Sequence, residues 1–195
     1  MTKHRHDTEI TRSELLSSAR IAFSEHGYAG AGTEEIVARH GLTRGALYHH
    51  FGSKLSLFEA VVEDLQRELS REVERRARRT RGDHVDRLRA GFRTYLDFAL
   101  RPDFRRILLT DGPAVLGWDR WHEIDFDHAF GATRAALQAA MAHGELGPSP
   151  VDELAHVLLG AVTQAGLEIG RSQHPRAARR RYGTVIDLLV ESIRR

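Results

Sequence analysis

The sequence contains no cysteine and only two lysines, Lys3 and Lys54, among its 195 residues. Without cysteine, disulfides, thiolate metal sites and thiol catalysis are excluded. No apolar run approaches the roughly 20 residues that cross a bilayer, and the N-terminal stretch MTKHRHDTEI is too polar for a signal peptide. These absences predict a cytoplasmic protein with no membrane partner.

Motifs of common enzyme chemistry are also missing. The chain has no phosphate-cradling glycine loop, no HExxH and no Ser-His-Asp order. His122, Asp125 and His128 are close in sequence, but their spacing does not place all three on one helical face. We therefore expect no metal site and no cofactor, and an enzyme on a helical scaffold is an alternative without support from a motif.

Charge alone gives only a weak indication of a nucleic-acid partner. The chain has 29 basic and 27 acidic residues, which leaves a formal net charge of +2. Any attraction to a nucleic acid therefore has to come from the local placement of basic side chains.

Nearly every segment has the helical period, and no alternating strand pattern is found. This predicts an all-α protein of about nine helices. We expect an arm and a small N-terminal domain over residues 1–54, a connecting helix over 55–81, and a helical effector-binding and dimerisation domain over 82–195. Helices are expected over about 11–26, 33–41, 43–50, 53–81, 83–99, 102–111, 118–143, 151–172 and 175–194, with residues 1–10 as a mobile arm.

The segment 33–54, TEEIVARHGLTRGALYHHFGSK, has the layout of a helix-turn-helix, in which the second helix enters the major groove of DNA. Gly41 suits the tight turn, because a residue without Cβ enters the left-handed region without strain. Thr33, Thr43 and Ser53 are expected N-caps. The expected core of this domain consists of Leu16, Ala19, Phe23, Ile36, Val37, Leu42, Leu47 and Phe51.

The helix after the turn leaves a small polar, aromatic and basic surface. Arginine can bond a guanine edge, threonine a phosphate or thymine methyl, and tyrosine or histidine a phosphate oxygen. Both threonines could instead be caps only, and Tyr48 could simply pack its ring. The outward-facing residues are Thr43, Arg44, Gly45, Ala46, Tyr48 and His49, with Lys54 at the start of the next helix.

From Leu15 to Phe58 the sequence resembles the DNA-binding domain of the TetR family of transcriptional regulators. The matching stretches are AFSEHGY (22–28), the turn at Gly41-Leu42-Thr43, GALYHHF (45–51) and Ser53-Lys54. The resemblance implies a homodimer on a double-stranded DNA operator. It implies DNA contacts by Thr33, Thr43, Arg44, Gly45, Tyr48, His49 and Lys54.

Most of the aromatic residues lie between positions 92 and 130, which favours an apolar pocket for a small molecule. A filled helical core explains the same pattern equally well. The resemblance implies an inducer pocket in this part of the chain but assigns no residue to it. Our candidate ligand-binding residues are Phe92, Tyr95, Trp118, Trp121, His122, Phe126 and Gln164.

The two C-terminal segments carry broad apolar stripes that also include Val157 and Val185. These stripes could pack within their own domain or against a second subunit, and the resemblance implies a four-helix dimer bundle. The candidate interface residues are Leu158, Ala161, Val162, Ala165, Tyr182, Ile186 and Leu189.

Together these features predict a repressor that binds an inverted-repeat operator as a homodimer and releases it when a small-molecule effector binds. Two alternatives stay open. One is a transcriptional activator, since the same head serves either sign of control. The other is a helical small-molecule-binding protein without a DNA function.

Overall fold

A computed structural model describes the backbone of residues 2–194 and the side chains of residues 9–194. In this part of the chain there are nine α-helices, one π-helical segment and no strand, which confirms the all-α prediction. Leu146 and Arg194 form an isolated antiparallel bridge. Within the same residues, no helix combines the length and apolar character needed to cross a membrane.

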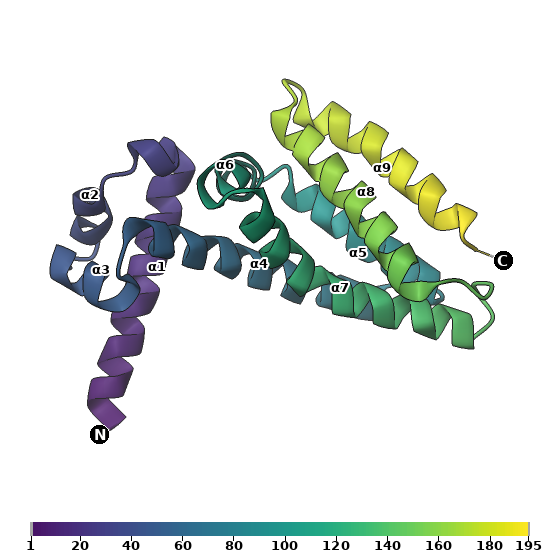
Figure 1. Cartoon of the computed structure of the whole chain (residues 1–195), viewed down its shortest axis with the longest axis horizontal. Helices are drawn as coiled ribbons and strands as arrows, with labels where there is room; N and C mark the ends of the chain where they lie inside the picture. The colour runs from purple at the N-terminus through teal and green to yellow at the C-terminus, as the bar shows by residue number, and fades with distance from the viewer. Residues whose placement is uncertain (1, 195) are drawn as a thin grey trace.

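The helices form a small head and a larger body, joined by one long helix (Figure 1). The head consists of α1 (Thr2–Gly30), α2 (Thr33–Ala38) and α3 (Arg44–Phe51). Helix α4 (Lys54–Arg79) leads from the head into the body. The body consists of α5 (His84–Phe98), the π-helix η1 (Phe104–Asp111), α6 (Gly112–Leu116), α7 (Trp118–Ala142), α8 (Val151–Arg171) and α9 (Pro175–Ser192).

Helix α1 begins earlier than the sequence indicated. It is helical from Thr2, where we expected a mobile arm over residues 1–10, and Met1 lies outside the described residues. Once a helix has nucleated, each further residue adds a backbone hydrogen bond at little entropic cost, so polar residues can extend it. The predicted end of this helix near residue 26 is confirmed, because Gly27 has a φ of 70°, outside the helical region. Helical residues resume after this kink and end at Gly30.

Most of the expected caps are present. The hydroxyl of Thr43 accepts from the amide of Ala46 at 3.2 Å, and that of Ser53 accepts from the amide of Ser56 at 2.9 Å. The prediction that Thr33 caps α2 was wrong. Helix α2 starts one residue earlier, with Gly32 at the cap position and no side chain bonded to the free amides.

The predicted end of a helix at residue 111 was also wrong. The π-helix η1 passes directly into α6 at Gly112, and Pro113 lies in the first turn of α6. A proline is compatible with this continuous path, because its fixed φ of about −65° is that of a helix.

The core of the head follows the prediction with a small rotation of α1. Ala19, Phe23, Ile36 and Leu47 are fully buried. Leu16, Leu42 and Phe51 are only partly buried, and Leu15 takes the central place expected of Leu16. The ring of Phe23 meets Phe58 of α4 edge to face at 5.2 Å, which fixes the head on the connecting helix.

Candidate DNA-binding surface and effector cavity

Helix α3 separates its residues cleanly between core and solvent. Leu47 is fully buried, while Tyr48 exposes 44% of its surface. Thr43, Arg44, Gly45 and His49 are exposed as well, and Ala46 is half-buried. Gly41 has a φ of 65°, in the left-handed region that the predicted turn requires. The turn thus aims one polar and basic face of α3 away from the head.

Arg44 is held only weakly in place. Its Nη1 donates to Oε1 of Glu34 at 3.1 Å, and its guanidinium lies 5.9 Å from the ring of Tyr48. Both members of the ion pair are exposed, and such pairs contribute little to stability. Arg44 can therefore exchange Glu34 for a guanine edge or a phosphate without a large loss.

Lys54 and Thr43, beside α3, carry hydrogen-bond donors of the kind that bind DNA phosphates. The ammonium of Lys54 lies 4.7 Å from the ring centre of Tyr28, a cation–π contact that holds the charge at the start of α4. The hydroxyl of Thr43 uses an oxygen lone pair for its cap and keeps its hydrogen free to donate. Thr33 lies half-buried at the first position of α2.

Arg12 is a further candidate for a DNA-contacting residue, and the sequence pattern did not indicate it. It is exposed on α1, and its guanidinium lies 5.1 Å from the ring of Phe51 at the end of α3. Burial and the neighbouring charges of His49 and Arg12 lower the pKa of His50. The amphipathic pattern of α1 marks Arg12 as exposed, but only the tertiary packing places it beside α3.

The body encloses a cavity of about 200 Å³ between α4, α5, α7 and α8. Two of the predicted ligand residues, Phe92 and Tyr95, lie on its wall. The wall is mostly apolar, with the polar groups confined to a few positions. The polar residues deepest in the wall are Gln66, Asp125 and Thr163, and His128 also contributes to the lining.

Asp125 is the buried acid of this cavity. Gln66 Nε2 donates to its Oδ1 at 2.6 Å, and Thr163 Oγ1 donates to its Oδ2 at 2.9 Å. Burial raises the pKa of Asp125, and these two hydrogen bonds offset only part of that rise. The buried hydroxyl of Tyr95 has no hydrogen-bond partner among the described residues. The cavity therefore has a buried acid, Asp125, in a wall that is otherwise mostly apolar.

The other five predicted ligand residues lie outside the lining of this cavity. Trp121 is fully buried in the core, while Trp118 is 52% exposed and His122 and Gln164 are exposed. Phe126 is half-buried and stacks with His156 of α8 at 4.7 Å. The aromatic spacing on α7 does not reveal which face turns toward the cavity, because packing against α4 and α8 sets that rotation.

The predicted interface residues divide in the same way. Leu158, Val162, Ala165 and Ile186 are buried within their own chain, and Ala161 and Tyr182 are half-buried. Leu189 is exposed. The exposed apolar residues of α8 and α9 form a stripe beside these buried positions. It contains Val157, which is 69% exposed, Val185, Leu188, which is 65% exposed, and Leu189.

The head and body together define a helix-turn-helix protein with an internal cavity, and comparison with known proteins gives its family. Residues 15–61 match the sequence profile of the bacterial regulatory proteins of the tetR family, and residues 85–193 match that of the tetracyclin repressor-like C-terminal domain. The chain belongs to the TetR family. It is a transcriptional regulator with a helix-turn-helix DNA-binding domain, and not an enzyme.

Individual relatives agree with this assignment. A crystal structure of a TetR-family transcriptional regulator from Pectobacterium atrosepticum has 31% identity, covers 97% of each chain and has a TM-score of 0.86. The transposon Tn10 TetC protein of Escherichia coli is 27% identical over 77% of this chain and 75% of its own length. The transcriptional activator FasR of Mycolicibacterium smegmatis is 43% identical over 45% of this chain, and the match spans only 39% of that activator.

Proposed function

We propose that the protein is a ligand-responsive repressor that binds an inverted-repeat operator as a homodimer. The observation that carries this proposal is α3, which presents Arg44, Tyr48 and His49 outward above the buried Leu47. Thr33, Thr43, Gly45 and Lys54 complete the proposed contact surface. Arg44 reads base edges, and the others position the head on the phosphates.

The exposed stripe of α8 and α9 supports dimerisation. Val157, Val185, Leu188 and Leu189 leave large apolar side chains in water on two adjacent helices (Figure 1). A second copy of the same stripe would bury them and produce two-fold symmetry. Two heads then reach two half-sites, which increases specificity beyond what one head can give.

The cavity supports control by a small effector. Its walls include α4, the helix that carries the head, and α7 of the body. The head is also fixed to the π-helix of the body, because the amide of Tyr28 donates to Oδ2 of Asp111 at 2.7 Å. An effector that favours a different packing of α4 against α7 would shift the two heads out of register with the operator. In this proposal residues 1–54 form the DNA-binding domain, 55–81 the connector and 82–195 the effector-binding and dimerisation domain.

Selection of bound sequences from a random duplex pool tests the proposal. We expect enrichment of an inverted repeat whose half-sites lie about one helical turn, roughly 34–36 Å, apart. Affinity for the enriched duplex should fall steeply with added salt, because both heads neutralise phosphates. Recovery of no common sequence would contradict the proposal.

Activation is the second candidate for the sign of control, and the match to FasR, which is named an activator, favours it. A transcription assay with the selected operator placed over or upstream of a promoter separates the two. Repression predicts fewer transcripts when the protein is added, and activation predicts more.

A further inference from the structure

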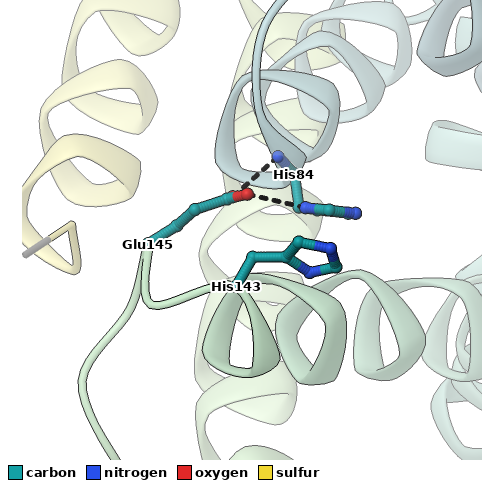
Figure 2. Close-up of side chains that lie close together, drawn as sticks. All are labelled: His84, His143 and Glu145. Atoms are coloured by element: carbon teal, nitrogen blue, oxygen red, sulfur yellow. Dashed lines mark hydrogen bonds and ion pairs between the residues drawn. The ribbon is translucent and has the colours of Figure 1, made fainter.

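Two histidines and a glutamate meet at the end of the body that lies farthest from the head. His84 begins α5, His143 follows the last residue of α7, and Glu145 lies in the next loop. One possible ligand atom from each of the three lies within 4.8 Å of the other two. Figure 2 shows the two imidazole rings one above the other, with Glu145 beside His84. The ring centres are 4.5 Å apart.

Glu145 is fixed by three hydrogen bonds. Its Oε2 accepts from the backbone amides of His84 at 2.7 Å and Val85 at 3.3 Å, and its Oε1 lies 2.7 Å from Nδ1 of His84. Because the carboxylate of Glu145 accepts from both backbone amides, Nδ1 of His84 is the donor to it as well. In the neutral ring of His84, Nε2 is then the nitrogen with a free lone pair.

His143 also donates through Nδ1, but to a backbone carbonyl oxygen. Its Nδ1 lies 2.8 Å from the carbonyl oxygen of Ala139, which can only accept, so Nδ1 carries the hydrogen. Its Nε2 also has a free lone pair. Figure 2 shows that both rings extend to the same side, away from the carboxylate of Glu145.

We propose that His84 and His143 bind a divalent transition-metal ion through their Nε2 atoms, with Glu145 orienting His84 from behind. An imidazole whose other nitrogen donates to a carboxylate or carbonyl is the usual form of a metal-bound histidine. Imidazole ligands select zinc, nickel, copper or iron over magnesium and calcium, and no cysteine competes for the ion. Water would complete the coordination, since the site is open to solvent at His143.

Such an ion would join the start of α5 to the end of α7. These two helices also supply Phe92, Tyr95 and Asp125 to the effector cavity. Arg194, near the C-terminus, donates to Asp86 at 2.9 Å and so packs against the same end of α5. Metal binding would therefore restrain the walls of the cavity. The metal site is tested without DNA, so the outcome of that test does not depend on the proposed repressor function.

The test measures the thermal midpoint of the tag-free full-length protein with ZnCl2, NiCl2 or MgCl2. We expect zinc and nickel at about 100 times the dissociation constant to raise the midpoint by roughly 5–10 °C, and magnesium to leave it unchanged. His143→Ala should abolish the rise. Since this side chain is exposed and bonds only to its own helix, the metal-free midpoint should stay the same.

A matched control is available in α8. His156 is also an exposed helical histidine, and its Nδ1 lies 2.6 Å from the carbonyl oxygen four residues earlier. His156→Ala should keep the full zinc response. Glu145→Gln should weaken zinc binding by roughly 10- to 100-fold, as expected for a residue that orients a ligand.

Two results would overturn the proposal. One is the absence of any zinc or nickel response in the wild type. The other is an equal response in the wild type and His143→Ala, which would assign the binding to other histidines. Should His143→Ala unfold, the zinc affinity of His84→Gln, measured by calorimetry, replaces it, and an unchanged affinity would reject the site.

Discussion

Arg20 of the DNA-binding head donates through Nη2 to Oδ2 of Asp103 in the body, at 2.6 Å. Two more residues close this pair into a ring. Arg20 also lies 2.8 Å from Glu68 of α4, and Arg101 lies 2.6 Å from Glu68 and 2.9 Å from Asp103. Opposite charges alternate around the ring, and it joins the head, the connecting helix and the start of η1. The ring therefore ties the head that carries α3 to the body that contains the cavity.

Arg20→Ala should destabilise the fold by about 1–2 kcal/mol, between the values for exposed and fully buried ion pairs. The reason is that Asp103 and Glu68 keep their partial burial but lose one cationic partner. Urea unfolding measures the change. Arg134→Ala removes an exposed pair with Asp152 and should change stability by less than about 0.5 kcal/mol. Equal effects of the two substitutions would contradict a special role for the ring.

Asp103 predicts a defined pH dependence. Burial alone would raise the pKa of Asp103, but hydrogen bonds from Arg101, Arg20 and the Phe104 amide lower it from 3.8 to about 2. Because the folded-state pKa is depressed, the stabilisation is complete above about pH 4 and is lost as the pH falls toward 2. It amounts to about 2 kcal/mol. The difference in unfolding free energy between the wild type and Asp103→Asn should therefore shrink over this range. A difference that stays constant from pH 5 to pH 2 would reject the assignment.

Gly27→Ala should destabilise the protein by about 1–2 kcal/mol. Gly27 has a φ of 70°, which strains any residue with a Cβ, and an added Cβ would also displace the guanidinium of Arg106. Gly131→Ala is the matched control. No atom lies within 4 Å of a Cβ built there, inside helix α7, so alanine should stabilise by up to about 1 kcal/mol. Thermal or urea unfolding of both variants distinguishes these opposite signs.

Val157→Glu combined with Leu188→Glu should convert the proposed dimer to a monomer. Charges on both helices of the exposed stripe would have to be desolvated in the interface. Light scattering after size-exclusion chromatography gives the mass. Leu55→Glu, at an exposed leucine in the first turn of α4, should leave the mass unchanged. Persistence of a dimer in the double variant would show that subunits meet through another surface.

The features that the sequence predicted correctly are local. The caps at Thr43 and Ser53, the turn at Gly41 and the buried Leu47 depend on residues within one turn of each other. The motif around them is specific enough to indicate the family as well. Local spacing determines these features, and for this reason the sequence alone predicts them.

The features that the sequence did not predict depend on how helices rotate and meet. The stripe of α8 includes both Val157 and Leu158, and only the packing of the chain decides that Leu158 is buried and Val157 exposed. The same holds for Trp118 and Gln164, which lie outside the cavity. His84 and His143 are far apart in sequence, so their meeting follows only from the antiparallel course of α5 and α7.

The most direct test of the central claim is the affinity of α3 variants for the duplex recovered by selection, measured by fluorescence anisotropy at fixed salt. Arg44→Ala and Tyr48→Ala should each lower affinity by about 10-fold or more, whereas Arg134→Ala should bind as the wild type does. All three should keep the wild-type thermal midpoint, since the affected side chains are exposed. Wild-type affinity in both α3 variants would contradict the claim that this helix reads DNA.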